Sequence, residues 1–388
     1  MTEKRFTFTD IQAGIYEELF SYSEQDPSHP AYGCQITKKR LCGGPSDGVD
    51  IVKVNNGHLA FEALPTRGMG LWKAWCGGVE IGWSSPVKRP VHPSLVPLTQ
   101  PDGLGWLEGF GELLCRCGLE SNGAPEFDAK GQLVYPLHGR IANRPAYCVE
   151  ATVNNESGEL SLTGDVDEAR LFFNKMWLHS TIRTQPGSSS LTILDTVTNL
   201  SAEPGELELL YHINFGIPFL TPGARVLLPL AKLAPRDADA QKDLNTWNIY
   251  GPETPGSREV VFFTELAADS QGNTRVLLRN AEGNRAISLR MNRHQLPYFI
   301  LWKNRLAAAD GYVTGLEPAL NFPNVKSFEK KRGRVAILQP GESRIFEITL
   351  EVHEGAEAVA SAEKAVAQLQ AGSTPAILDH PDPAWSPV

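Results

Sequence analysis

The sequence predicts an all-β protein, folded as one large β-sandwich domain over residues 1–388. Three observations support this prediction. Many short runs alternate apolar and polar side chains, as half-buried strands do. The 35 glycines and 28 prolines occur without a low-complexity run, so they mark many turns. No linker-like stretch divides the chain, and almost no segment has the apolar spacing of a helix.

Residues 1–45 predict an irregular N-terminal arm, and strands are expected from Val49 onward. The turns between the strands contain residues that favour positive φ or a type II geometry. The clearest turns are Asn55-Asn56-Gly57, Gly77-Gly78, Gln185-Pro186-Gly187-Ser188 and Gln339-Pro340-Gly341-Glu342. Later strands are expected at residues 171–184, 191–199, 260–263, 275–279, 286–291, 298–303, 335–338 and 345–352.

One helix is expected, from Ala356 to Leu369. The segment is rich in alanine, which has the highest helix propensity. Val359, Ala362 and Val366 follow helical spacing, and Gly372 stops the helix. Residues 355–388 are therefore predicted to form a C-terminal helix followed by an extended, proline-rich tail.

The segment from Ser84 to Gly111 predicts a long loop rich in proline and glycine. Loops of this length inside a compact domain are more often functional than not. Two interpretations are open: a loop that closes over a ligand, and an ordinary surface Ω-loop.

Composition excludes several classes of function. The formal net charge of -9 argues against a nucleic-acid surface, which would need a basic stripe. The first twenty residues lack a signal peptide, and no window approaches the ~20 apolar residues of a membrane span. The six cysteines are therefore expected to be reduced, in a cytoplasmic protein. Cys115-x-Cys117 is too short and isolated for a zinc site, and no metal or organic cofactor is predicted.

The segment from Leu209 to Phe215 predicts a strand with two different faces. Tyr211, Ile213 and Phe215 fall on one face, which suits a core. His212 and Asn214 fall on the other face, and both can hydrogen-bond a polyhydroxylated ligand. An ordinary half-buried strand with a structural histidine would give the same pattern.

Four further features accompany this strand: Arg67 in Leu-Pro-Thr-Arg-Gly-Met, His138 followed by Gly139, two arginines at Arg140 and Arg144, and Glu317 in Gly-Leu-Glu-Pro. The order of the His-Gly pair, the Tyr-His-x-Asn-Phe strand and the late Gly-Leu-Glu-Pro resembles the aldose 1-epimerase (galactose mutarotase) superfamily. The chain looks closest to the poorly characterised, longer aldose-1-epimerase-like branch. The resemblance spans about residues 49–352.

The resemblance implies a β-supersandwich of two large, mainly antiparallel sheets, with a sugar on the concave face of the larger one. It implies that His212 is the general acid at the ring oxygen and Glu317 the general base at the anomeric hydroxyl. His138 would hydrogen-bond the sugar. Arg67 and Arg144 are looser matches to a substrate-binding arginine, and the choice between them is open.

The chain departs from the family pattern after His138, where Arg140 replaces a further glycine. A guanidinium beside the cleft would suit an anionic sugar, and Lys303 would add to this. Ion-paired loop arginines are the competing interpretation. Trp72, Trp83, Trp106 and Trp302 are candidates to stack on a sugar, although tryptophans in a sandwich more often belong to the core.

The sequence thus predicts a carbohydrate epimerase, a mutarotase that exchanges the α and β anomers of an aldose or acidic sugar. One base and one acid suffice for this reaction. Its partner would be a small-molecule carbohydrate, and a homodimer is left open. The alternatives are a non-catalytic sugar-binding protein, and a lyase or hydrolase that would take a second carboxylate from Asp102 or Glu108. A metal site built from His138, His212 and Glu317 is the least favoured alternative.

Overall fold

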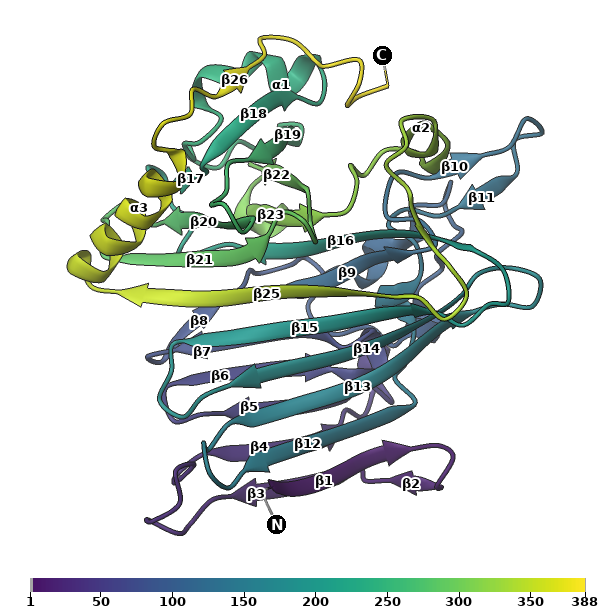
Figure 1. The fold of residues 1–388 in the computed structure, drawn as a ribbon, viewed down its shortest axis with the longest axis vertical. Helices are drawn as coiled ribbons and strands as arrows, with labels where there is room; N and C mark the ends of the chain where they lie inside the picture. Colours follow the sequence, from purple (N-terminus) through teal and green to yellow (C-terminus); the bar gives the residue numbers. More distant parts are fainter. Residues whose placement is uncertain (1–2, 388) are drawn as a thin grey trace.

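The computed structural model describes residues 3–387 and contains two large β-sheets packed face to face (Figure 1). The predicted domain also includes residues 1, 2 and 388, which lie outside the described residues. The predicted all-β class is confirmed, as are the two large sheets and the C-terminal helix. Within residues 3–387, no helix is long and apolar enough to cross a membrane.

The first sheet has ten strands, all paired antiparallel. Their order is β17 (Arg225–Leu227), β20 (Asn273–Arg279), β21 (Arg285–Asn292), β25 (Ser343–Glu354), β15 (Ser190–Asn199), β14 (Lys175–Thr184), β13 (Leu160–Ala169), β12 (Cys148–Asn154), β1 (Glu3–Asp10) and β2 (Ile15–Tyr16). The helix α3 (Ala356–Gln370) covers the outer face of β20, β21 and β25 (Figure 1).

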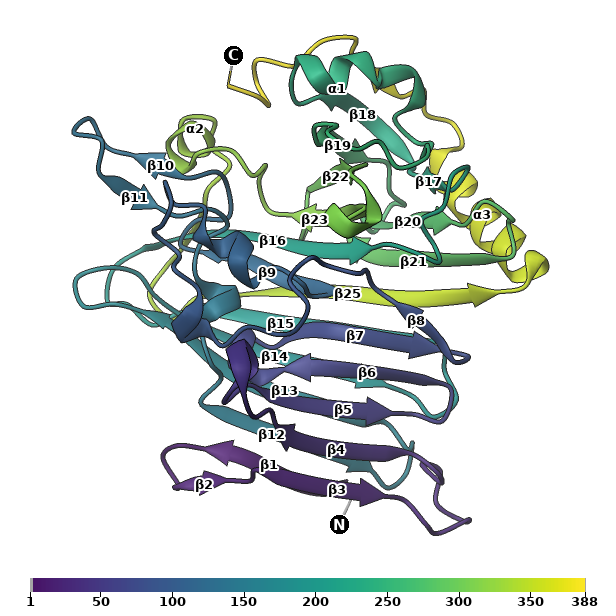
Figure 2. The ribbon, with the colours of Figure 1, turned by 180° about the vertical axis from the view of Figure 1, so that it is seen from behind.

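The second sheet has fourteen strands and is seen from its own side in Figure 2. Their order is β26 (Ala376–Ile377), β18 (Leu230–Pro235), β19 (Val260–Leu266), β22 (Tyr298–Asn304), β23 (Val313–Ala319), β16 (Gly205–Phe215), β9 (Leu114–Leu119), β7 (Gly70–Cys76), β6 (Leu59–Leu64), β5 (Asp50–Asn55), β4 (Gln35–Arg40) and β3 (Leu19–Ser23), with β24 (Ala336–Leu338) on β16 and β8 (Val79–Ile81) on β7. The smaller elements are the hairpin of β10 (Glu126–Phe127) and β11 (Leu133–Tyr135), and the short helices α1 (Ala238–Lys242) and α2 (Lys326–Lys331).

Burial follows the alternation that predicted the strands. In β13, β14 and β15 nearly every second residue is buried in the core between the sheets, and the others are partly exposed. The strand β16 differs, because all but one of its residues are buried. One of its faces packs against the ten-stranded sheet, and the other is covered by loops and aromatic side chains. This second face carries the candidate site.

The expectation of an irregular N-terminal arm is wrong. Within residues 3–45, β1 pairs with β12 in one sheet, and β3 and β4 form a hairpin in the other. Phe6, Phe8 and Phe20 pack together across these strands. The hydrophobic contacts between the two sheets therefore extend to the first described strand.

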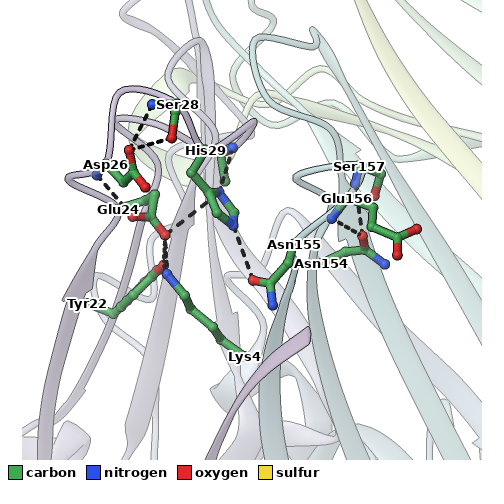
Figure 3. A network of polar contacts seen from close by, with 11 residues as sticks. Lys4, Tyr22, Glu24, Asp26, Ser28, His29, Asn154, Asn155, Glu156 and Ser157 are labelled. Atoms are coloured by element: carbon green, nitrogen blue, oxygen red, sulfur yellow. Dashed lines mark hydrogen bonds and ion pairs between the residues drawn. The ribbon is translucent and has the colours of Figure 1, made fainter. Parts of the chain in front are cut away.

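A polar network joins the sheets at the same edge (Figure 3). The buried carboxylate of Glu24 accepts hydrogen bonds from Lys4 and from the Tyr22 hydroxyl. These bonds, chiefly the one from Lys4, lower the pKa of Glu24 to about 2. His29 Nε2 lies 3.2 Å from Asn155 Oδ1, which ties the loop after β3 to the turn after β12. The network closes this edge of the sandwich.

Candidate active site

The strand β16 presents the predicted two faces. Tyr211, Ile213 and Phe215 point into the core between the sheets. His212 and Asn214 point to the opposite face, and their side chains are hydrogen-bonded to each other. The strand predicted from Leu209 to Phe215 is confirmed, within longer observed bounds.

Asn214 fixes the tautomer of His212. The Asn214 amide nitrogen donates to the Glu112 carbonyl at 3.0 Å, so its Oδ1 is an acceptor. His212 Nδ1 lies 2.7 Å from this oxygen and must therefore donate its proton to it. In the neutral ring, Nε2 then carries the lone pair. Asn214 thus orients the histidine, a role different from the expected contact with the ligand.

Glu317 lies on β23, the strand beside β16. Its Oε1 is 3.2 Å from His212 Nε2, and the two residues are only 2% and 5% exposed. Gly315 makes room for the carboxylate, because a Cβ built at this glycine would lie 2.1 Å from Glu317 Oε1. The two residues predicted as base and acid are therefore brought into direct contact.

Aromatic rings surround the His212 imidazole. The ring centroids of Phe110 and Trp302 lie 4.9 and 5.2 Å from that of His212. His138 lies 5.6 Å from His212, and its own ring packs edge-on against Trp106 at 4.6 Å. Trp106 and Phe110 come from the end of the long loop predicted from Ser84 to Gly111. This loop covers the site, which is consistent with the functional interpretation of its length.

Burial acts on the pKa values of the pair in opposite directions. Loss of solvation raises the pKa of Glu317 well above its usual value, and the nearby Glu259 carboxylate adds to this increase. Loss of solvation also lowers the pKa of His212 to about 3, with a further contribution from His138. Both changes favour uncharged groups. Burial therefore favours a neutral imidazole at His212 and a protonated carboxyl at Glu317.

His138 takes an unusual backbone conformation, with φ at 56°. Few residues other than glycine adopt this region, and such residues often occur at functional sites. Its Nδ1 donates to the Asn122 carbonyl at 2.8 Å, so its Nε2 carries the lone pair when the ring is neutral. The half-buried ring lies beside His212, where it can accept a hydrogen bond from a ligand hydroxyl.

Arg67 does not face an open cleft. Its side chain is buried, and each of its guanidinium nitrogens donates to the protein: to the carboxylate of Glu112, to the amide oxygen of Asn143, and to the carbonyls of Val91 and Gly109. The arginine therefore holds the loop that covers the site. This geometry argues against the expected contact with substrate.

Arg140 and Arg144 lie together at the border of the site. With Leu98 and Asn143 they line a cavity of about 290 Å³. Leu98 also packs against the buried hydrophobic cluster that includes Trp106. The Arg144 Nε donates to a backbone carbonyl and the side chain is otherwise exposed. The two arginines remain candidates for binding an anionic group of a ligand.

Lys303 lies on the wrong face of β22 for the predicted role. Trp302 points to His212, and Lys303 points to the other side of the sheet, because neighbouring residues of a strand alternate. Its ammonium donates to the carbonyls of Thr246, Trp247 and Ile249 at 2.9–3.0 Å. All three of its donors are used, so the expectation that Lys303 binds a ligand is corrected.

Several residues of the site were missed from the sequence. Gly315 could have been found, since its spacing of two from Glu317 puts both on one face of a strand. No sequence pattern pointed to Glu112 or Glu259, because the geometry of the loops brings them to the site. The Glu259 carboxylate accepts a hydrogen bond from the indole nitrogen of Trp302 at 2.7 Å. Asp102 and Glu108, considered for a second carboxylate, are exposed.

A comparison with known protein families shows to which family the chain belongs. A model described as "Domain of unknown function (DUF4432)" matches residues 46–352. The chain belongs to this family. The DUF4432 protein superimposes with a TM-score of 0.94 on a "putative aldose 1-epimerase" from Klebsiella pneumoniae subsp. pneumoniae MGH 78578. The two are 34% identical over 98% of this chain and 99% of that one. No curated protein matches the DUF4432 chain.

More distant solved structures share the fold of the DUF4432 protein. A galactose mutarotase-like protein from Clostridium acetobutylicum is 18% identical, with a TM-score of 0.55 over 82% of this chain and 98% of that one. A "putative aldose 1-epimerase" from Escherichia coli K12 is 16% identical, with a TM-score of 0.51 over 79% and 100% of the two chains. The predicted resemblance to the aldose 1-epimerase-like superfamily is confirmed.

Proposed function

We propose that the DUF4432 protein is a mutarotase, which exchanges the α and β anomers of an aldose or acidic sugar. The observation that carries the proposal is the contact of His212 Nε2 with Glu317 Oε1 at 3.2 Å. A base and an acid that can reach two neighbouring sugar oxygens are the groups that this reaction requires. The similarity to aldose 1-epimerase-like structures supports the same class of activity.

The reaction proceeds through the open-chain sugar. Glu317, as carboxylate, takes the proton from the anomeric hydroxyl, and the C1–O1 bond becomes a carbonyl. The bond between C1 and the ring oxygen breaks, and protonated His212 delivers its proton to that oxygen. Rotation about the C1–C2 bond and the reverse steps close the ring on the other face of C1. The pair starts and ends with one proton, so the cycle balances.

The resting pair already holds the single proton that this cycle needs. Burial favours its position on Glu317 when the site is empty of ligand. The hydroxyl groups of a bound sugar are polar, and they stabilise the charged arrangement in which His212 carries the proton. Asn214 keeps Nε2 directed at the reacting oxygen throughout. His138 hydrogen-bonds the sugar in this proposal, and Trp302 or Trp106 stacks against its ring.

Access to the pair requires movement. His212 and Glu317 are almost fully buried, and Trp106 and Phe110 of the long loop cover them. A small carbohydrate would enter when this loop moves away from β16, and the closed loop would then exclude water. In this proposal Arg140 and Arg144, which line one cavity, bind an anionic substituent of the sugar. We expect a cytoplasmic location, and a homodimer remains a prediction.

Anomer exchange measured by NMR saturation transfer tests the proposal. The panel would include neutral aldoses and uronic, phosphorylated and sulfonated sugars. Exchange above the buffer rate is expected for at least one sugar, and Arg140→Ala should weaken binding of an anionic substrate more than of a neutral one. Line broadening by ligands without exchange would favour the non-catalytic sugar-binding protein. Cleavage of an oligosaccharide would favour the lyase or hydrolase.

A further inference from the structure

A second group of reactive side chains lies at one end of the sandwich, away from β16. Within residues 3–387, His58, Cys76 and Glu354 are the three potential metal ligands whose donor atoms all lie within 4.8 Å of one another. His58 Nε2 is 3.0 Å from Glu354 Oε2, and Cys76 Sγ is 4.0 Å from the same oxygen. None of these residues takes part in the proposed reaction.

The local strands bring these residues together from both sheets. His58 directly precedes β6, and Cys76 ends the neighbouring β7, where it pairs with Leu59. Glu354 ends β25 of the other sheet. The glycine after Cys76 allows the close approach: a Cβ at Gly77 would lie 2.5 Å from Glu354 Oε1. The carboxylate of one sheet therefore rests on the hairpin of the other.

The three donors match the preferences of zinc. Zinc binds cysteine sulfur, histidine nitrogen and carboxylate oxygen, and bond lengths of about 2.0–2.3 Å in a tetrahedron separate neighbouring ligands by about 3.3–3.7 Å. The observed separations of 3.0 and 4.0 Å bracket this range. His58 and Glu354 are about one-third exposed, which leaves a fourth position open to water, and Cys76 is buried.

A neighbouring arginine does not block the site. Arg285 Nη1 lies 3.5 Å from Glu354 Oε1, and it makes no hydrogen bond with any described residue. His58 and Cys76 face the other carboxylate oxygen of Glu354, Oε2. We propose that His58, Cys76 and Glu354 form a binding site for a zinc-type divalent cation, which fastens β6 and β7 to β25.

Cobalt is the direct probe, because a bond between thiolate and Co²⁺ gives a charge-transfer absorption band. The full chain, treated with a chelator and then freed of it, is titrated with Co²⁺ and afterwards with Zn²⁺. We expect the band to saturate at one equivalent, and Zn²⁺ to displace it and raise the melting temperature. Cys76→Ser should lose the band. Cys42→Ser is the matched control and should keep it, because Cys42 is an exposed thiol outside the cluster.

The proposal is overturned if the wild type gives no band, or if Cys76→Ser keeps it. If Cys76→Ser does not fold, His58→Ala decides, since this partly exposed side chain can be removed without opening the core. We expect His58→Ala to weaken Co²⁺ binding roughly tenfold or more. Unchanged affinity in this variant would also overturn the site.

Discussion

At the scale of single residues, the chemistry depends on how His212 and Glu317 share one proton. His212 Nε2 and Glu317 Oε1 lie 3.2 Å apart, and the pair has the same total charge whichever of the two groups carries the proton. Burial favours the uncharged arrangement, and a bound sugar favours the charged one. Both arrangements contain the proton needed at the ring oxygen.

The pH dependence of anomer exchange follows from these shifts. The active pair loses function when it gains a second proton or loses its only one. The pKa of His212 is lowered to about 3, so the second proton binds well below the usual histidine range of about 6.5. The pKa of Glu317 is raised, so the last proton leaves above the usual carboxyl range. After subtraction of the buffer rate, kcat should stay level as pH falls through 6.5. An acid limb centred there would contradict the coupled pair.

Asn214→Ala removes the acceptor that fixes the histidine tautomer. We expect kcat to fall roughly 10- to 100-fold with little change in KM, the range for a histidine that loses its orienting partner. Nitrogen NMR shifts of His212 should then report a mixture of tautomers. Asn214→Asp keeps the acceptor oxygen, and should keep the tautomer while moving the acid limb to higher pH. Full activity in Asn214→Ala would remove this positioning role.

At the scale of elements, the site results from the pairing of β16 with β23. Alternation along β16 was enough to predict that His212 and Asn214 share a face. The family resemblance predicted that Glu317 acts with His212. The sequence could not predict which groups the side chains of Arg67 and Lys303 contact. A buried cation can face a ligand or backbone carbonyls, and here the surrounding loops supply the carbonyls.

Gly315→Ala tests the register of these two strands. The new methyl group would lie 2.1 Å from the Glu317 carboxylate, and it must push the carboxylate away from His212. A displacement of this size should slow anomer exchange by roughly 100-fold. Gly251→Ala is the matched control, because its Cβ would meet no atom within 4 Å and its φ is not positive. Equal exchange rates in both variants would contradict the placement of Glu317.

At the scale of the whole molecule, the two sheets are joined by polar contacts as well as by the core. Arg116 of β9 and Asp195 of β15 form a fully buried bidentate pair between the sheets. Tyr211 of β16 also donates to Asp195. The class and number of large sheets were predictable from alternation and turns. The placement of β1 was not predictable, since its pairing depends on β12, which lies more than 100 residues further along the chain.

Asp195→Ala should destabilise the whole sandwich. It leaves the Arg116 charge buried without its partner, which costs about 3–5 kcal/mol. Chemical denaturation should show this loss as a lower midpoint with an unchanged slope. Asp239→Ala removes a partly exposed partner of the exposed Lys242 and Arg258 side chains, and should change the midpoint little. Similar midpoints for the two variants would mean that the buried pair does not hold the sheets together.

The most direct test of the central claim compares anomer exchange by NMR in the wild type, His212→Gln, Glu317→Gln and the double variant. Residues that act as one unit have non-additive effects. We predict that each single variant abolishes exchange above the buffer rate, that the double variant is no worse, and that all three still bind the sugar. Wild-type exchange in either single variant would contradict the assignment of these two residues as the acid and the base.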